Sequence, residues 1–172
     1  MKIWIIGSPG AGKSFLGRQL GTALNLPHTE LDYIFWEPKW TIKDSNLFVD
    51  DVKSITATPS WVIDGNYTAS APILHESADI LIWLNPSFLR SYRRVLSRTY
   101  QRLRDKEPIC NGNYETFWKA VSRDGMPYYS ARHHRRVQKR LMGFWEPFER
   151  KKIKLANTET YMKDIKAFLG TD

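Results

Sequence analysis

One short segment near the N-terminus constrains this chain more than any other. Residues 7–14 read Gly-Ser-Pro-Gly-Ala-Gly-Lys-Ser, which satisfies the pattern G-x-x-x-x-G-K-[ST] in full. The apolar run 3–6, rich in isoleucine, precedes this segment, and a helical pattern of apolar residues follows it over 15–24. The motif requires a strand, a glycine-rich loop and a helix in that order. The sequence therefore predicts a phosphate-binding loop between a buried parallel strand and a helix.

The residue types in this loop suit one kind of ligand. Glycines let the backbone wrap closely around a polyphosphate, with N–H groups and the helix N-terminus directed at it. Lys13 can reach the β- and γ-phosphates, and the Ser14 hydroxyl can ligate Mg²⁺. An ordinary glycine turn is the alternative, but the complete motif in this context favours ATP and Mg²⁺ as cofactors. The expected nucleotide-binding residues are Gly7, Ser8, Pro9, Gly10, Ala11, Gly12, Lys13, Ser14 and Phe15.

Length and cysteine content limit the classes of protein. A chain of 172 residues suits one α/β domain with a proper core, so a single domain over residues 1–172 is expected. Cys110 is the only cysteine, which excludes an internal disulfide and a cysteine-based metal site. No apolar run approaches the roughly 20 residues that span a membrane, and the N-terminus lacks the layout of a signal peptide. We therefore expect a cytoplasmic protein without a membrane partner.

Positive charge is concentrated in one part of the chain. The formal net charge is +8. Residues 86–156 contain 18 Lys and Arg against 6 Asp and Glu, whereas residues 1–85 contain 6 against 9. Such a basic segment can bind nucleic acid, an acidic membrane surface, or the phosphates of a bound nucleotide.

Apolar runs and helical patterns alternate along the chain. Strands are expected at 3–6, 28–31, 61–64, 80–84 and 152–156. Helices are expected at 15–24, 47–55, 87–104, 132–144 and 159–169, the second of them capped by Asp44 or Ser45. This alternation predicts an α/β fold of the phosphate-loop type, with a five-stranded parallel sheet covered by helices on both faces. Residues 105–131, with their prolines and glycines, are interpreted as a mobile, lid-like insert.

Polar side chains follow three of the expected strands. Asp32, Asp64 and Asn85 stand at carboxyl ends of strands, where ligands of such sheets bind. Asp64 is therefore a candidate Mg²⁺ ligand together with Ser14. Gly65 follows it, where many hydrolytic ATPases carry a glutamate, and this favours transfer to an acceptor over hydrolysis. The alternative for Asp64 is a strand-end aspartate that caps the next turn.

Asp32 is the candidate residue for a phosphate acceptor. A carboxylate at this position could align a substrate hydroxyl or accept its proton, although it could also be a solvated loop carboxylate. Four aromatic residues follow it and could form a wall for a flat or apolar substrate or belong to the core. They are Tyr33, Phe35, Trp36 and Trp40.

The basic segment contains a regular stripe of arginines. Arg90, Arg94, Arg98 and Arg102 recur every fourth residue, on one side of the helix expected over 87–104. Phosphoryl transfer needs cations over the transferring group, and closing lids can supply them. The candidates are Arg98, Arg132, Arg135 and Arg136. A solvated basic face is the alternative for each single arginine, and His133 and His134 are interpreted as surface residues.

Four segments together resemble a known family. They are residues 7–14, the run Glu30-Leu-Asp32 with Trp36 and Trp40, and the segments Trp61–Tyr67 and Arg94–Arg98. In these segments the chain resembles the bacterial DNA topology modulation proteins, which are in turn similar to adenylate kinase and shikimate kinase. The resemblance covers about residues 1–104 and is weaker beyond them.

The resemblance implies roles for three residues. Asp64 corresponds to an aspartate near Mg²⁺ in nucleotide kinases, Asp32 to an acceptor-binding aspartate of shikimate-type kinases, and Arg98 to a lid arginine of nucleotide kinases. Two positions depart from these patterns. Phe15 replaces a common threonine, and residues 66–68 read Asn-Tyr-Thr where nucleotide kinases have Phe-Pro-Arg, which argues against a nucleoside monophosphate as acceptor.

Two hypotheses of function follow. The first is a Mg²⁺-dependent kinase that transfers the γ-phosphoryl group of ATP to a nucleoside, nucleotide or hydroxyl-bearing metabolite, with Lys13, Asp32, Arg98, Arg132 and Arg136 as catalytic residues. The second is a nucleic-acid-associated ATPase or regulator that binds through the basic segment. The chain lacks a zinc-ligand set and an aromatic RNA-binding motif. We therefore expect weak DNA binding that disappears near physiological salt.

Overall fold

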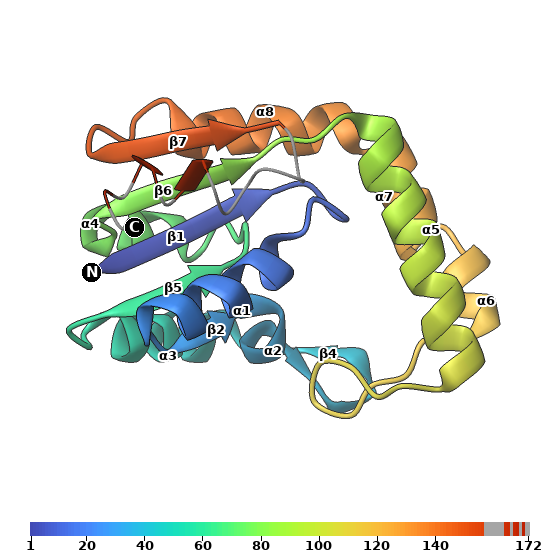
Figure 1. Cartoon of the computed structure of the whole chain (residues 1–172). Helices are drawn as coiled ribbons and strands as arrows, with labels where there is room; N and C mark the ends of the chain where they lie inside the picture. The colour runs from blue at the N-terminus through green and yellow to red at the C-terminus, as the bar shows by residue number, and fades with distance from the viewer. Residues whose placement is uncertain (157–163, 166, 169, 171–172) are drawn as a thin grey trace.

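A computed structural model of the chain describes residues 1–156, 164–165, 167–168 and 170. Parallel strands form its main sheet in the order β2-β5-β1-β6-β7, so that β1 is central (Figure 1). The strands are β1 (Lys2–Gly7), β2 (His28–Glu30), β5 (Trp61–Asp64), β6 (Ile80–Leu84) and β7 (Lys151–Leu155). The five-stranded parallel sheet predicted from the sequence is confirmed.

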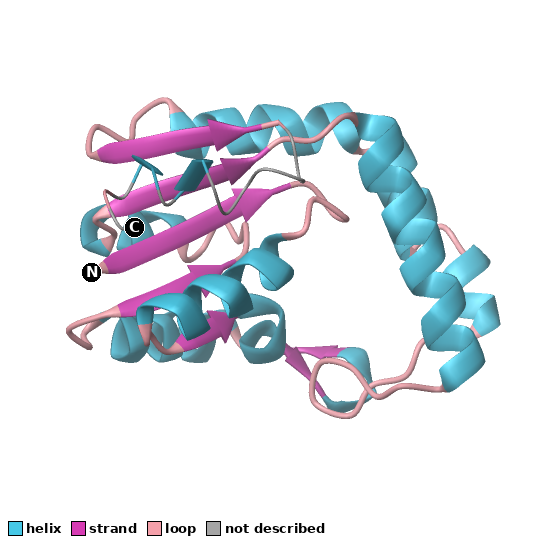
Figure 2. Cartoon of the chain, viewed as in Figure 1, coloured by secondary structure: helices cyan, strands magenta, loops and turns pink. Residues whose placement is uncertain are grey.

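The central strands are apolar on both faces because helices cover both (Figure 2). On one face, Ile3 and Ile5 of β1 pack against Leu16 of α1. On the other, Trp4 lies in a larger core with residues of α3, α4 and α8. The bounds of these helices are α1 Lys13–Leu24, α3 Ser45–Thr56, α4 Ala71–Ser77 and α8 His134–Trp145. Such two-sided burial is typical of parallel α/β sheets.

The structure corrects the end of the second strand. β2 stops at Glu30, which pairs with Asp64, the last residue of β5. No further residue of β5 remains to pair, so the chain turns at once into the short helix α2 (Leu31–Phe35). Asp32 therefore lies in the first turn of a helix rather than directly after a strand. The helix expected over 159–169 lies largely outside the described residues.

Several short elements follow the second strand and were missing from the expected order of elements. A two-stranded antiparallel hairpin pairs β3 (Trp36–Glu37) with β4 (Thr41–Ile42), and a single 3₁₀ turn, η1 (Pro38–Trp40), joins them. We call residues 36–42 the hairpin. Strands of two residues lack the length to show a period-two pattern, so sequence patterns do not reveal them.

The lid-like insert contains more regular structure than its composition indicates. α5 (Phe88–Asp105) leaves the sheet and leads into the insert, which holds α6 (Phe117–Val121) and nearly all of α7 (Met126–Arg132). α7 packs against α5, and the turn at 109–113 reaches back toward the hairpin (Figure 1). The mobility of this insert stays a prediction.

Candidate active site

The phosphate-loop segment has the backbone that its glycines permit. Gly10 has a φ of 75°, and a Cβ there would lie 2.2 Å from the carbonyl oxygen of Ser91 in α5. Only glycine fits this position without moving the backbone of α5. Gly12 is the N-cap of α1, and no side chain caps the helix. The loop is thus held tightly against α5, with the N-terminus of a 12-residue helix directed at the site.

A cleft of about 560 Å³ opens beside this loop, within the range of roughly 300–1,000 Å³ typical of ligand sites. Most of the residues singled out by the sequence line it. These are Pro9, Gly10, Gly12, Lys13, Ser14, Phe15, Asp32, Asp64 and Arg98. Nucleotide-binding, metal-binding and acceptor candidates from separate elements therefore meet in one cavity.

Three residues of the loop motif lie behind this surface. Ala11 is fully buried, and Ser8 is buried too. The backbone N–H of Gly7 donates to Oδ1 of Asn66 at 3.1 Å, and Nδ2 of Asn66 donates back to the Gly7 carbonyl at 2.7 Å. Asn66 thus fixes the start of the loop to the end of β5. Its position next to the Asp64-Gly65 pair was the only sequence signal for this role.

Lys13 is a cation prepared for an anionic ligand. The cleft lowers the pKa of Lys13, chiefly because its ammonium group has lost water, while the charges of Asp64 and Asp32 oppose the shift. Among the described residues, no side chain forms a hydrogen bond or salt bridge with this ammonium group. A desolvated cation without such a partner is costly. A phosphate group in the cleft would supply the missing counter-charge.

Ser14 and Asp64 present two oxygen atoms to the same point of the cleft. The Ser14 hydroxyl donates to Oδ1 of Asp64 at 3.2 Å. Mg²⁺ binds oxygen ligands at about 2.1 Å with octahedral geometry, which places neighbouring ligands roughly 3 Å apart. The pair therefore fits the Mg²⁺ site predicted from the sequence. The second carboxylate oxygen of Asp64 is 2.8 Å from Nε2 of His28, a neighbour that the sequence patterns did not indicate.

Asp32 is held by a tyrosine. The hydroxyl of Tyr67 donates to Oδ1 of Asp32 at 2.7 Å. Burial and the charge of Asp32 raise the pKa of Tyr67, so its hydroxyl remains a donor at neutral pH. The Tyr67 ring packs on Phe35, with 4.3 Å between the ring centroids. The hydrogen bond between Tyr67 and Asp32, which are 35 positions apart in sequence, fixes one oxygen of an exposed carboxylate that lines the cleft.

The aromatic residues after Asp32 were expected either to form a wall for a substrate or to belong to the core, and they divide between these two positions. Phe35 and Trp36 line the cleft, and Phe35 also packs on the core residue Phe48. Trp40 contacts Trp36 and lies half-buried under the insert. Tyr33 is exposed. The cleft therefore has an aromatic wall in which Phe35 contacts the core and Trp36 packs on Phe35.

The structure brings some of the candidate arginines together and separates others. Arg98 and Arg94 of α5 and Arg140 of α8 line the cleft. Burial, together with Arg102, lowers the pKa of Arg98, which makes it another desolvated cation. Arg140 was not expected in the cleft. The apolar residues Val137, Leu141 and Phe144 share its side of α8 and were the signal that it turns inward.

Arg132 and Arg136 do not reach this cleft. Together with Arg135 they line a separate hollow of about 740 Å³ at the start of α8. His133 and His134 border it, half-buried rather than exposed as surface residues would be. α7 ends at Arg132, and Arg135 and Arg136 follow in the first turn of α8, so that all three line the hollow and none of them lines the cleft. Their predicted catalytic role therefore has no support from the position of the side chains.

Comparisons with solved structures identify the fold. The chain is similar to shikimate kinase from Bacteroides thetaiotaomicron, with a TM-score of 0.61 and 14% identity over 99% of this chain and 98% of that one. It is similar to deoxyadenosine kinase from M. mycoides with bound dATP, with a TM-score of 0.60 and 16% identity over 99% and 100%. It is also similar to shikimate kinase from Acinetobacter baumannii in complex with shikimate, with a TM-score of 0.57 and 17% identity over 98% of this chain and 93% of that one.

These likenesses confirm the phosphate-loop kinase fold. No model of a known protein family matches the chain, and no curated protein has a significantly similar sequence. Membership of the DNA topology modulation family therefore stays a prediction from the sequence.

Proposed function

We propose that this chain, which has the fold of small phosphate-loop kinases, transfers the γ-phosphoryl group of ATP to a hydroxyl group of a small molecule. The observation that carries the proposal is the single cleft in which the phosphate-loop lysine, a fitted Mg²⁺ site and the Asp32–Tyr67 pair meet. A nucleoside, a nucleotide or a hydroxyl-bearing metabolite fits this chemistry. The two sorts of neighbour, shikimate kinase and deoxyadenosine kinase, support a small-molecule acceptor.

The nucleotide end of the cleft is built to hold phosphates. The loop backbone and the N-terminus of α1 would bind the phosphate oxygens, and Lys13 would bridge the β- and γ-phosphates. Ser14 and Asp64 would hold Mg²⁺. The ion, when bound with ATP, would neutralise charge on the β- and γ-phosphate oxygens.

The acceptor end is built to hold a hydroxyl group. Tyr67 occupies one oxygen of Asp32, which leaves the other to accept a hydrogen bond from a substrate hydroxyl. The hydroxyl oxygen then attacks the γ-phosphorus, the bond from this phosphorus to the β,γ-bridging oxygen breaks, and Asp32 receives the hydroxyl proton. Arg98, with Arg94 and Arg140 beside it, stabilises the charge on the transferring group. Phe35 and Trp36 supply an apolar surface for the body of the acceptor.

A screen of nucleosides, nucleotides and small alcohols for acceptor-dependent ADP formation tests the proposal. With the acceptor in hand, Asp32→Asn should keep ATP affinity and lose about 10²-fold or more in acceptor-dependent turnover, the scale of a removed acid–base group. Asp79→Asn is the matched control, because Asp79 is exposed and lies outside the cleft. Equal losses of ATP binding and turnover in Asp32→Asn would make Asp32 structural and contradict its role.

The basic hollow at the start of α8 favours a second candidate function, nucleic-acid binding. Arg132, Arg135 and Arg136 gather there beside the aromatic rings of Phe88 and Tyr128. Among the described residues, no carboxylate forms a salt bridge with these three arginines. Exposed arginines next to aromatic rings are typical of single-strand binding surfaces.

Salt-dependent binding separates the two functions. We expect weak binding of single-stranded DNA that disappears near physiological salt. A plot of log affinity against log salt has a negative slope, and its magnitude should decrease by about 0.7 for each phosphate contact that a substitution removes. Arg132→Gln and Arg136→Gln should reduce this slope, whereas Arg98→Ala should leave it unchanged and cut kinase turnover about 10²-fold or more. Fluorescence anisotropy and steady-state kinetics give the two readouts. Tight binding at about 150 mM salt, where such phosphate contacts are usually weakened, with turnover indifferent to Arg98, would overturn the kinase assignment.

The cellular location stays a prediction. Within the described part of the chain, none of the helices combines the length and the apolar character needed to cross a membrane. The cytoplasmic location expected from the sequence agrees with a kinase that uses ATP.

A further inference from the structure

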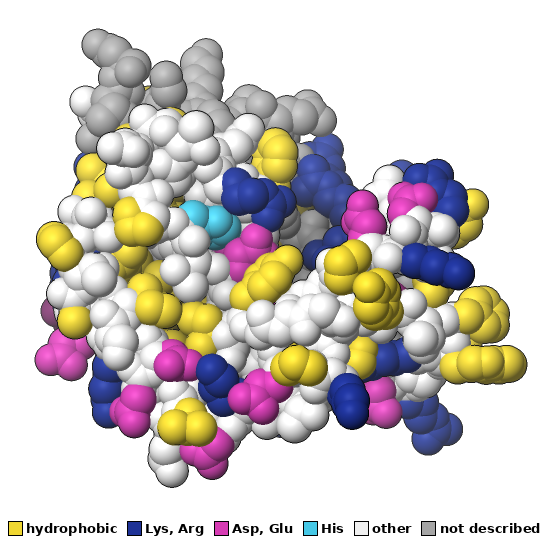
Figure 3. Space-filling model, turned by 90° about the horizontal axis from the view of Figure 1, so that it is seen from below, with side chains coloured by type: hydrophobic (Ala, Val, Ile, Leu, Met, Phe, Trp, Pro, Cys, Tyr) yellow, Lys and Arg dark blue, Asp and Glu magenta, His cyan; other side chains and the backbone are white. Residues whose placement is uncertain are grey.

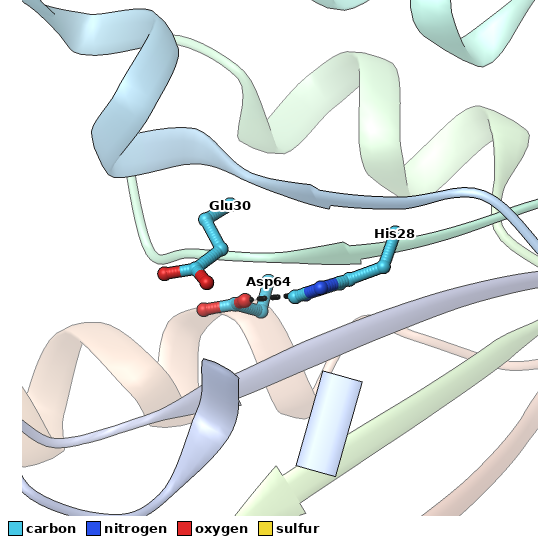
Figure 4. Close-up of side chains that lie close together, drawn as sticks. All are labelled: His28, Glu30 and Asp64. Atoms are coloured by element: carbon cyan, nitrogen blue, oxygen red, sulfur yellow. Dashed lines mark hydrogen bonds and ion pairs between the residues drawn. The ribbon is translucent and has the colours of Figure 1, made fainter. Parts of the chain in front are cut away.

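Three side chains with metal-binding atoms meet beside the phosphate loop (Figure 4). His28 and Glu30 come from β2, and Asp64 is the last residue of β5. Residues two apart on a strand point to the same face, and the register sets Glu30 opposite Asp64. In Figure 4 the Asp64 carboxylate lies between the other two side chains. One potential ligand atom from each residue lies within 4.8 Å of the other two.

The distances suit a shared ion. Nε2 of His28 and Oδ2 of Asp64 are 2.8 Å apart, and an octahedral ion with ligands at about 2.1 Å needs neighbouring ligands roughly 3 Å apart. The two atoms therefore already stand at nearly the separation that neighbouring ligands of one ion need, and neither side chain has to repack. Glu30 is fixed from outside, because Arg18 binds its Oε1 at 2.7 Å. Its second carboxylate oxygen remains for the ion.

The imidazole is packed in place before any ion arrives. The side chains of His28 and Asp64 are only 11% and 5% exposed. Gly17 of α1 makes room for the ring, because a Cβ at this position would lie 2.2 Å from Nε2 of His28. Side chains locked by packing lose little conformational freedom on binding, which strengthens a metal site.

We propose that His28, Glu30 and Asp64 bind a divalent transition-metal ion, with Mn²⁺ as the probe, in the protein without nucleotide. Carboxylates suit Mn²⁺, and an imidazole nitrogen selects transition metals over Mg²⁺ and Ca²⁺. The site differs from the proposed Mg²⁺ site. Ser14 faces Oδ1 of Asp64, whereas His28 faces Oδ2. The nucleotide Mg²⁺ needs phosphate oxygens to complete its coordination, whereas three ligands of this site come from the protein.

Titration of MnCl₂ into metal-free, nucleotide-free protein tests the proposal, with free Mn²⁺ followed by electron paramagnetic resonance. We expect one bound ion per chain. Pulsed electron paramagnetic resonance of the bound Mn²⁺ should show an echo modulation caused by a directly coordinated histidine nitrogen. His28→Asn and Glu30→Gln should each weaken binding at least tenfold. Ser14→Ala should weaken binding much less than His28→Asn does, because Ser14 contacts Oδ1 of Asp64 and supplies no ligand to this site.

Two control variants match the ligand variants. His133→Asn and Glu37→Gln change half-buried side chains of the same types at other places, and should bind Mn²⁺ as the unchanged protein does. Circular dichroism establishes that each variant is folded. Two results with the unchanged protein would overturn the proposal. One is bound Mn²⁺ that shows no nitrogen modulation, and the other is no binding at millimolar Mn²⁺. An equal loss in Ser14→Ala and His28→Asn would also overturn it, since the ion would then be the nucleotide metal. Neither result depends on ATP binding or turnover.

Discussion

The two sides of the cleft are built in different ways. The sheet side, from β1 to β6, rests on a core that includes the fully buried Trp4, Trp61 and Trp83. The insert side is a chain of short helices, and its outer surface carries Phe117 and Trp118, the latter 80% exposed. Apolar side chains are visible on the surface of the molecule in Figure 3, among clusters of Lys and Arg. Burial of apolar surface stabilises the first side, and much less of it is available to the second.

Polar contacts hold the insert to the hairpin. Nδ2 of Asn111 donates to the carbonyl oxygen of Trp36 in the hairpin at 2.8 Å, and to that of Tyr33 in the preceding helix α2 at 2.7 Å. Nδ2 of Asn113 donates to the carbonyl of Glu37 at 2.9 Å, and Oδ1 of Asn113 accepts from the N–H of Trp40 at 2.6 Å. Each such bond contributes only about 0.5–1.5 kcal/mol. We therefore expect the insert to open at lower cost than the sheet side unfolds, as a lid must.

The largest expected effect contrasts two tryptophans. Trp4→Ala should lower the free energy of unfolding by about 3–5 kcal/mol, because it empties a core position and removes the indole hydrogen bond to the Gly65 carbonyl at 3.0 Å. Trp118→Ala, at an exposed position of the insert, should change it by less than about 0.5 kcal/mol. Urea denaturation measures both. Similar losses in the two variants would mean that the insert carries as much stability as the sheet.

A smaller effect is expected at the contact between the insert and the hairpin. Asn113→Ala removes two bonds to the hairpin and a third, from Nδ2 to the Cys110 carbonyl within the insert, and should cost about 1–2 kcal/mol at this contact. Cys110 reports the opening, because burial raises the pKa of its thiol to about 11. At pH 8 the thiol is protonated, so iodoacetamide should react with it slowly. The reaction rate should rise as the pH approaches the pKa of the thiol.

Asn113→Ala should speed this alkylation at pH 8 and lower the urea midpoint much less than Trp4→Ala does. Asn85→Ala is the matched control, since Asn85 follows β6 on the sheet side. An unchanged alkylation rate in Asn113→Ala would show that the insert does not rely on this contact.

The same contrast explains which features the sequence could predict. The phosphate loop and the five strands depend on local patterns of glycine and apolar residues, and the strand bounds differ from the expected ones by one residue at most. The contact of Asn113 with Trp40 spans 73 residues and that of His28 with Asp64 spans 36. Neither leaves a periodic signal. Arg136 and Arg140 have equal charge and lie one turn apart on α8, and Arg140 alone of the two lines the cleft. The apolar residues on its side of the helix were the signal for this.

The central claim is that the cleft beside the phosphate loop binds ATP·Mg²⁺ through Lys13. Calorimetric titration of ATP·Mg²⁺ into the unchanged protein, Lys13→Ala and Lys39→Ala tests it most directly, since Lys39 is exposed and lies outside the cleft. We expect one ATP per chain, an affinity at least about tenfold weaker in Lys13→Ala because a charge-assisted contact is lost, and no change in Lys39→Ala. Circular dichroism should show all three folded. Unchanged affinity together with unchanged turnover in Lys13→Ala would contradict the claim.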